Sequence, residues 1–260
     1  MKDVFLSIVI PAYNEEKKIG RTLSLIVDYL NKKIFDWEII VIDDGSRDRT
    51  KDIIKRFMGD KRISLIGNEK NRGKGYSVKK GILRAQGGFI LFSDADLSTP
   101  IDEMDKLFLC LRNGYDIAIG SRGLEESKII IPQFWIRQTM GKIFNLIIRF
   151  FILPGIKDTQ CGFKLFKGSI AKKVFSLLKI DGFAFDVEVL YIAEKLNLKI
   201  KEVPIKWYDS PESKVNPTID SFKMLIDVCK IKMRSIRKKY RCTKINDNAS
   251  RKESGVGKSS

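Results

Sequence analysis

The sequence predicts an α/β protein built on a mostly parallel sheet with helices on both faces. Over the first 120 residues, short apolar segments of strand length alternate with amphipathic segments of helix length. Gly, Pro, Asp or Asn residues follow the apolar segments, as they commonly do at strand ends. This alternation produces parallel strands joined by crossover helices, so the polar residues after successive strands are expected at one edge of the sheet.

The expected elements of the N-terminal half follow this pattern. Strands are expected at residues 6–10, 37–42, 63–66, 89–93 and 116–120, and helices at 15–30, 50–57, 73–85 and 100–113. The first helix carries its apolar residues on one face, at Ile19, Leu23, Ile26, Val27 and Leu30.

The pattern changes after Gly123. A long, very apolar helix is expected at 135–153, a strand at 162–166, helices at 170–178 and 185–196, a strand at 199–207 and a basic amphipathic helix at 221–239. We expect one domain over residues 1–240, with halves at 1–122 and 123–240. The basic, polar tail at 241–260 is expected to be disordered.

Composition excludes several kinds of site. The chain has no His, which excludes a Ser-His-Asp triad and His-ligated zinc. Its four Cys residues are widely spaced and form no CxxC motif, so we expect no disulfide framework. We therefore expect the protein to reside in a reducing compartment. No signal peptide is recognisable at the N-terminus, and no apolar run reaches the ~20 residues that span a bilayer.

The net charge of +17 is unevenly distributed. Residues 230–260 contain eleven Lys and Arg residues against Asp247 and Glu253, which gives this stretch a net charge of +9. A basic C-terminal stretch predicts an anionic partner, either a nucleic acid or a membrane surface. A nucleic acid is not expected, because no module that reads a groove or stacks bases accompanies the basic stretch.

Two carboxylates, Asp94 and Asp96, follow the apolar segment at 89–93. Carboxylates this close repel each other, and Mg²⁺ or Mn²⁺ bridging them to a phosphate would remove the repulsion. Taken alone, the pair is better explained as an Asp-rich turn and helix cap. The neighbouring loops decide between the two interpretations.

Three further loops at strand ends or helix starts carry distinctive residues. They are the segments 11–16, 43–48 and 71–75, which contain Tyr13, Asp43 and Lys74. Acids beside a glycine suit a nucleotide base, its ribose hydroxyls and a metal-bound diphosphate. Each loop alone is also consistent with a simple turn, but their succession favours a binding site.

In this order and spacing, the segments SIVIPAYNEE, VIDDGSRDRT, NRGKGYSVKKG and DADLS resemble the family 2 inverting glycosyltransferases, which have the GT-A fold. The resemblance continues through Gly120-Ser121-Arg122 and the segments 155–166, 182–188 and 207–215. These later segments are similar to the polyprenyl-phosphate sugar transferases, first the dolichyl-phosphate β-glucosyltransferases and second the dolichyl-phosphate mannose synthases. The resemblance as a whole covers residues 6–237.

The resemblance implies roles for individual residues. It implies a nucleotide-sugar site of Pro11, Tyr13, Asn14, Glu15, Asp43, Asp44, Lys74, Asp94, Ala95, Asp96, Arg122 and Lys214. Asp94 and Asp96 match the metal-binding motif, so Mg²⁺ or Mn²⁺ is the implied cofactor. Arg122 and Arg137 match cations near the donor and acceptor phosphates. Asp94, Asp96, Arg122 and Asp158 are the implied catalytic residues.

The chemistry of the acceptor determines whether a base is needed. An acceptor phosphate is already anionic near neutral pH and needs none, whereas a hydroxyl acceptor would need a carboxylate. Asp186 or Glu188 would then be the expected base. The alternative is that both are solvent-exposed acids favoured by the start of a helix.

Two segments predict contact with a membrane. Residues 143–153 would form ~16 Å of apolar helix, which suits either an interfacial helix beside a lipid acceptor or a core helix. Arg137, near the start of this helix, would lie at headgroup level. The basic helix at 221–239 would face anionic lipid, or simply solvent.

The resemblance implies transfer of a hexose, with glucose from UDP-glucose favoured, to dolichyl or undecaprenyl phosphate for protein or cell-envelope glycosylation. The chain lacks the membrane helices of eukaryotic and some bacterial relatives, so a peripheral or monotopic enzyme on the cytoplasmic face of a membrane is expected. The alternatives are transfer of mannose from GDP-mannose, transfer to a saccharide or protein hydroxyl, and a non-enzymatic basic adaptor.

Overall fold

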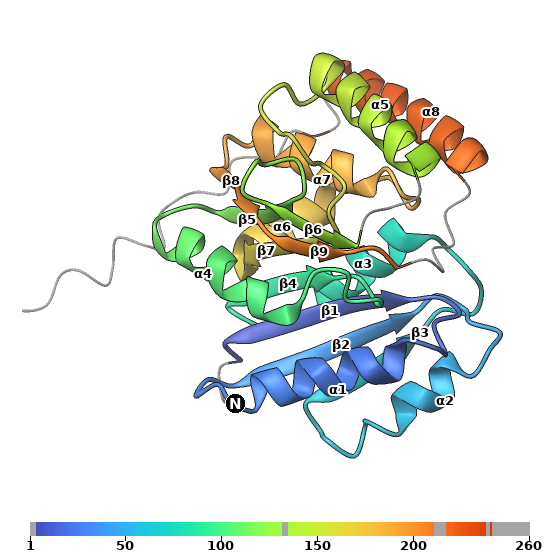
Figure 1. The fold of residues 1–260 in the computed structure, drawn as a ribbon, viewed down its shortest axis with the longest axis vertical. Helices are drawn as coiled ribbons and strands as arrows, with labels where there is room; N and C mark the ends of the chain where they lie inside the picture. The colour runs from blue at the N-terminus through green and yellow to red at the C-terminus, as the bar shows by residue number, and fades with distance from the viewer. Residues whose placement is uncertain (1–3, 132–134, 211–216, 238–239, 241–260) are drawn as a thin grey trace, which may run out of the picture.

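The computed structural model describes residues 4–131, 135–210, 217–237 and 240, with the side chains of 135–140, 142, 143 and 217–221 left out. A seven-stranded sheet with the order β3-β2-β1-β4-β7-β5-β8 forms its centre. A separate two-stranded sheet pairs β6 with β9. Figure 1 shows helices on both faces of the large sheet.

The first four strands are parallel and buried. They are β1 (Leu6–Ala12), β2 (Trp37–Asp43), β3 (Ile63–Gly67) and β4 (Phe89–Ser93). Leu6 pairs with Trp37 on one side and with Phe89 on the other, so β1 and β4 are neighbours although two strands separate them in sequence. Their carboxyl ends, which carry the distinctive loops, therefore meet at one edge.

The central layer continues through an antiparallel strand. Strand β7 (Phe163–Lys167) lies between β4 and β5 (Ile117–Ser121) and runs opposite to both. Strand β8 (Ile200–Pro204) pairs in parallel with β5 and is the last strand of the sheet on this side. Because β7 is reversed, it begins where the other strands end, and the loop before it lies at the same edge as Asp94.

Two apolar cores lie on opposite faces of the sheet. On one face, Ile8 and Ile10 pack with α1 (Ile19–Leu30), α2 (Thr50–Lys55) and α4 (Met104–Arg112). On the other, Val9 and Ile42 pack with α3 (Lys74–Arg84), α6 (Gly168–Leu177) and α7 (Phe185–Lys195). Alternate residues of a strand face opposite sides, so the continuous apolar run of β1 supplies both cores.

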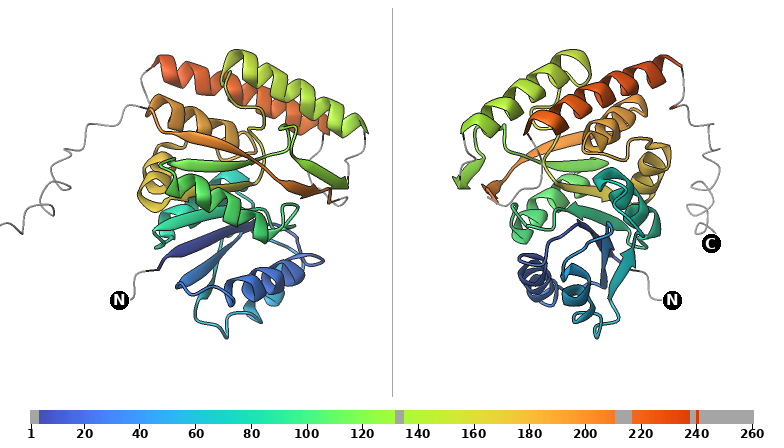
Figure 2. Two further views of the ribbon diagram at one scale, coloured as in Figure 1. Left: turned by 60° about the vertical axis from the view of Figure 1, so that its left-hand side comes forward. Right: turned by 90° about the vertical axis from the view of Figure 1, so that its right-hand side faces the viewer.

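Two further helices form a layer at one end of the molecule. Helices α5 (Trp135–Phe151) and α8 (Pro217–Ile236) lie side by side there in every view (Figures 1 and 2). Their buried residues, including Ile148 and Ile231, join the core on the α7 side. None of the helices in the described part of the chain is both long and apolar enough to cross a bilayer.

The structure corrects several expected boundaries. Helix α1 begins at Ile19 rather than 15, because residues 15–18 form a turn. The predicted strand at 199–207 is divided into β8 and β9 (Lys206–Tyr208), and the predicted helix at 100–113 begins as a 3₁₀ turn, η1 (Ile101–Glu103). Strand β6 (Lys128–Ile131) was not predicted. The predicted disordered tail at 241–260 lies outside the described residues.

Candidate active site

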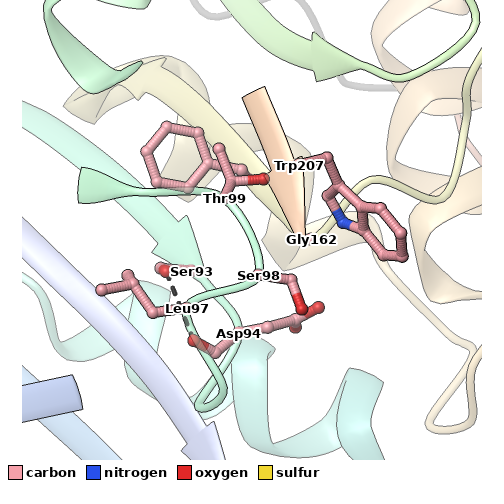
Figure 3. Close-up of a pocket in the computed structure, with 8 residues that line it drawn as sticks. Ser93, Asp94, Leu97, Ser98, Thr99, Gly162 and Trp207 are labelled. Atoms are coloured by element: carbon pink, nitrogen blue, oxygen red, sulfur yellow. Dashed lines mark hydrogen bonds between the residues drawn. The ribbon is translucent and has the colours of Figure 1, made fainter. Parts of the chain in front are cut away.

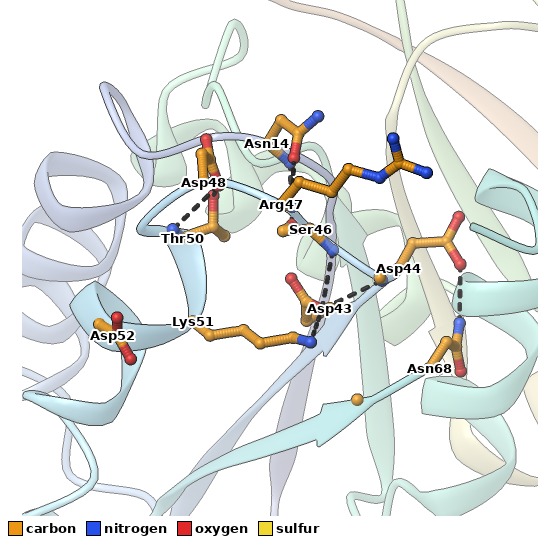
Figure 4. Close-up of polar contacts among 12 residues, drawn as sticks. Asn14, Asp43, Asp44, Ser46, Arg47, Asp48, Thr50, Lys51, Asp52 and Asn68 are labelled. Carbon is orange, nitrogen blue, oxygen red and sulfur yellow. Dashed lines mark hydrogen bonds and ion pairs between the residues drawn. The ribbon is translucent and has the colours of Figure 1, made fainter. Parts of the chain in front are cut away.

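The loops at the carboxyl edge of the sheet are tied together by hydrogen bonds. The backbone N–H of Asn14 donates to Ser46 Oγ at 2.9 Å, and Asn14 Oδ1 accepts from the backbone N–H of Arg47 at 2.8 Å (Figure 4). The N–H of Glu15 donates to Thr50 Oγ1 at 2.7 Å. The predicted residues Pro11 to Glu15 therefore form one unit with the loop after β2.

Asp43 is a fully buried carboxylate with one oxygen that has no partner among the described residues. Its Oδ2 accepts the backbone N–H groups of Gly45 and Ser46 at 3.0 and 3.1 Å and lies 3.4 Å from Lys51 Nζ. Its Oδ1 has no hydrogen-bond partner among the described residues. Buried carboxylate oxygens are rarely left without a donor, so Oδ1 suits a donor from a bound base or ribose.

Asp44, by contrast, holds the next loop in place. Its Oδ1 accepts from Asn68 Nδ2 at 2.7 Å and from the N–H of Arg72 at 2.9 Å, and its Oδ2 accepts from the N–H of Gly73 at 2.9 Å. Gly73 has a φ of 103°, a conformation that favours glycine. These contacts set the position of Lys74, the first residue of α3.

Lys74 forms an ion pair with the first acid of the predicted metal motif. Its Nζ lies 2.7 Å from Asp94 Oδ1. Burial alone would lower the pKa of Lys74, but the negative charges of Asp94 and Asp186 outweigh it and raise that pKa. Lys74 is therefore a fixed positive charge beside the acidic pair.

The acidic pair is fitted closely to the loop before β7. Asp94 donates its backbone N–H to the carbonyl of Gly162 at 3.0 Å. A Cβ at position 162 would lie 2.0 Å from Asp94 Oδ2, so only glycine leaves room for the carboxylate. Asp96 Oδ1 accepts from the N–H of Ser98 at 3.0 Å.

These residues fit a divalent cation that is held partly by the protein and partly by the phosphate groups of a bound ligand. Burial and the nearby charge of Asp94 raise the pKa of Asp96, and a cation would offset both effects. The described residues contain no cluster of three potential ligands from His, Cys, Asp and Glu. Mg²⁺ commonly takes one or two carboxylates and completes its shell with phosphate oxygens and water, which agrees with two acids beside a diphosphate site.

A small pocket opens beside Asp94. It is a shallow hollow whose space is continuous with solvent. Figure 3 shows the side chains of Trp207, Ser98 and Asp94 around it. Its lining consists of Ser93, Asp94, Leu97, Ser98, Thr99, Gly162, Phe163 and Trp207.

Arg122, immediately after β5, forms a forked ion pair with Asp158. Its Nε donates to Oδ2 at 2.7 Å and its Nη2 to Oδ1 at 2.9 Å, and its backbone N–H also donates to Oδ2. Asp158 is 2% exposed, and burial alone would raise its pKa, but Arg122 outweighs burial and lowers that pKa. Asp158 is thus a positioning residue for Arg122, whose guanidinium retains N–H donors for a phosphate.

Replacing Asp158 with asparagine is expected to lower the free energy of unfolding by about 3 kcal/mol. Removing one partner of a buried ion pair leaves an uncompensated charge, which costs roughly 3–5 kcal/mol. The lower end applies because Arg122 is 25% exposed. Urea unfolding of the variant and the native chain measures the difference.

The forked pair between Arg62 and Asp60 provides the matched control. Arg62 Nε and Nη2 contact Asp60 at 3.0 and 2.7 Å, but both side chains are more exposed. Asp60→Asn should therefore change stability by less than about 1 kcal/mol. Equal losses in the two variants would contradict the structural role given to Asp158.

The acids that would serve a hydroxyl acceptor are both buried, so their interpretation as solvent-exposed acids is wrong. Asp186 and Glu188 are 3% and 0% exposed. Glu188 Oε2 accepts from the N–H groups of Lys179 and Ile180, and its Oε1 accepts from Tyr240 Oη at 2.5 Å. Glu188 therefore joins α7 to the residues around it and has no oxygen free of these contacts.

Asp186 is paired with a lysine to which sequence reasoning gave no role. Lys164 lies within β7, is 1% exposed, and donates from Nζ to Asp186 Oδ1 and to the carbonyl of Cys161, both at 2.5 Å. Burial raises the pKa of Asp186 despite the opposing charges of Lys164 and Lys74. A lone lysine in the apolar segment Gly162–Phe166 was the available signal, since a buried lysine needs an anionic partner.

Two predicted site residues cannot be placed by their side chains. Arg137 belongs to α5, but its side chain lies outside the described residues, and so does all of Lys214. Ala95 is buried between the two acids, and its carbonyl accepts from Thr22 Oγ1 at 2.7 Å. The roles proposed for the predicted residues remain predictions.

The fold and site define a class of protein. Residues 7–175 match the family model described as Glycosyl transferase family 2, and the chain belongs to this family. The chain is 36% identical over 245 residues to a protein of Dictyostelium discoideum named dolichyl-phosphate beta-glucosyltransferase, covering 89% of this chain and 75% of that protein. It is 35% identical over 250 residues to the human protein of the same name, covering 91% and 77%.

A solved structure has a similar fold. It is the glucosyl-3-phosphoglycerate synthase of Mycobacterium tuberculosis in complex with Mn²⁺, UDP and glucosyl-3-phosphoglycerate, with a TM-score of 0.66 and 17% sequence identity. The match covers 88% of this chain and 80% of the synthase. The predicted α/β GT-A fold and the predicted family are thereby confirmed.

Proposed function

We propose that this chain transfers glucose from UDP-glucose to a polyprenyl phosphate, with inversion, at the cytoplasmic surface of a membrane. The observation that best supports this proposal is the arrangement at one edge of the sheet, which brings together the acidic pair, Lys74 and the Arg122–Asp158 pair. The names of the relatives in Dictyostelium and humans support glucose and a dolichyl-type acceptor. The UDP of the similar synthase structure supports the choice of nucleotide.

Each group has a role in the proposed reaction. Asp94 and Asp96 would hold Mg²⁺ or Mn²⁺, which when bound supplies a Lewis acid for the charge on the departing diphosphate. Lys74 adds a fixed positive charge at the same place. Asp43 Oδ1 would accept a hydrogen bond from the nucleotide. Arg122, fixed by Asp158, would bind a phosphate and orient it.

A phosphate acceptor agrees better with the described site than a hydroxyl acceptor does. The oxygens of Glu188 are occupied by protein donors, and Asp186 is paired with Lys164. Neither carboxylate is arranged as a free general base. A phosphate oxygen is anionic near neutral pH and can attack the anomeric carbon directly, from the face opposite the departing UDP.

The outer helices support the proposed location at a membrane. Exposed apolar side chains occur on α5, at Leu146 and Phe150, and on α8, at Phe222 and Ile236. Helix α8 also exposes several lysines among them, at 223, 230 and 232. Apolar and cationic side chains together favour the surface of an anionic bilayer.

A transfer assay with the full chain tests this function. UDP-glucose and GDP-mannose are each offered with a polyprenyl phosphate in detergent, and separately with a methyl glucoside as a hydroxyl acceptor. We expect a glucosyl phosphopolyprenol with β configuration by NMR, formed with Mn²⁺ or Mg²⁺ and lost in EDTA. Transfer to the glucoside alone, or no transfer from either donor, would refute the proposal.

A further inference from the structure

A small apolar ribbon projects beside the site. It consists of β6 and β9, and all four residues of β6 are exposed. Ile129, Ile130 and Ile131 are 42%, 50% and 49% exposed. A two-stranded sheet is marginally stable by itself, and three consecutive exposed isoleucines are unfavourable in water unless something covers them.

The ribbon is attached to the loops of the active site at both strands. Before β6, Ser127 Oγ donates to the carbonyl of Ser121, the residue that precedes Arg122, at 2.6 Å. At β9, the N–H of Tyr208 donates to the carbonyl of Ser98, in the loop after the acidic pair, at 2.9 Å. The ribbon is therefore positioned by the two loops that carry the proposed phosphate and metal ligands.

The strand pairing places an isoleucine next to the site. Ile129 pairs with Trp207, and paired residues have neighbouring side chains. Trp207 lines the pocket beside Asp94, and its ring centroid lies 5.4 Å from the guanidinium carbon of Arg122. After a bulge, Ile131 pairs with Tyr208, which is 37% exposed. Trp207, which is 8% exposed, thus lies between the cation of Arg122 and the exposed isoleucines of the ribbon.

We propose that Ile129 and Ile131 bind the first isoprene units of the acceptor, whose phosphate lies at Arg122. The inference rests on the proposed function and names the surface that recognises the acceptor's chain. An amphiphile with an anionic head and a branched apolar tail matches the sequence of cation, indole and isoleucines. The acceptor chain is favoured over bulk lipid because the ribbon is joined to the wall of the pocket through Trp207 and Tyr208.

Serine substitutions test the assignment. Ile129→Ser and Ile131→Ser are compared with Ile34→Ser, since Ile34 is fully exposed near the start of β2, at the opposite edge of the sheet. The binding of a ten-carbon prenyl phosphate in detergent is measured in the absence of UDP-glucose. In a separate transfer assay, the KM values of the acceptor and of UDP-glucose are measured. We expect acceptor Kd and KM to rise roughly tenfold in the first two variants, with UDP-glucose KM within twofold and no change in Ile34→Ser.

The possible results separate this inference from the proposed function. If the native chain binds the prenyl phosphate but transfers no glucose, and the ribbon variants bind it less tightly, the function fails and the surface stands. If both ribbon variants still transfer glucose and bind the acceptor as tightly as the native chain does, the assignment of the ribbon to the acceptor chain is overturned and the proposed function stands. A parallel rise in UDP-glucose KM, or an equal loss of binding to vesicles without acceptor, would also overturn it, by assigning the ribbon to the donor site or to bulk lipid.

Discussion

Replacing Gly162 with alanine is expected to lower kcat by about two orders of magnitude without unfolding the protein. The added Cβ would lie 2.0 Å from Asp94 Oδ2 and 2.3 Å from its Cγ. The backbones cannot easily separate, because Ser93 pairs with Phe163 and the N–H of Asp94 donates to the carbonyl of Gly162. The carboxylate must therefore rotate away from the proposed metal site, and misplacing a catalytic group by 1 Å costs about 10²-fold in rate.

Gly155→Ala is the matched control for this variant, because it lies in the same loop. A Cβ added at Gly155 would meet no described atom within 4 Å. The kcat for glucosyl transfer and the affinity for Mn²⁺ in the presence of UDP should fall in Gly162→Ala and stay unchanged in Gly155→Ala. Native kcat and Mn²⁺ affinity in Gly162→Ala would show that the close approach of Asp94 has no catalytic role.

Asp96→Ala is expected to lower transfer by about three orders of magnitude. It removes one of the two carboxylates proposed to hold the cation, and Lewis-acid stabilisation of a departing group is worth several kcal/mol. The loop after β4 also loses the acceptor for the N–H of Ser98. The initial rate of glucosyl phosphopolyprenol formation at saturating Mn²⁺ measures the effect.

The stability of the same variant should distinguish a catalytic defect from a folding defect. Removing Asp96 relieves its repulsion with Asp94, which offsets the lost hydrogen bond to Ser98, so the free energy of unfolding should stay within about 1 kcal/mol of native. Asp52→Ala is the control, because the Asp52 side chain is 68% exposed and pairs only weakly with Lys55 at 3.4 Å. If Asp96→Ala retains native activity, the acidic pair is not the metal site.

The first half of the fold could be predicted from the sequence because its information is local. Apolar strands alternate there with amphipathic helices, and the expected strand at 89–93 agrees with β4. Parallel pairing then places Asp43 and Asp94 at one edge, as expected from their positions at the carboxyl ends of two parallel strands. Strand β6 was missed because a four-residue element after a polar turn gives too short a pattern to recognise.

The roles of individual acids depend on residues far away in the sequence. Asp158 meets Arg122 across 36 positions, and Glu188 meets Tyr240 across 52. No local pattern tells whether a carboxylate oxygen will be left without a partner, as Asp43 Oδ1 is among the described residues, or be used by the protein, as the oxygens of Asp44 are. The sequence could therefore nominate these acids but could not distinguish the ones that hold the structure together.

The reversed strand β7 has a consequence for how the protein acquires its site during synthesis. Strand β4 is made early, but its neighbour on one side is β7, which follows more than 60 residues later. Until residue 167 has left the ribosome, β4 is an unpaired sheet edge of the kind that promotes aggregation. Asp94 likewise lacks Gly162 until then, so the proposed metal site is complete only when the chain has folded back on its own beginning.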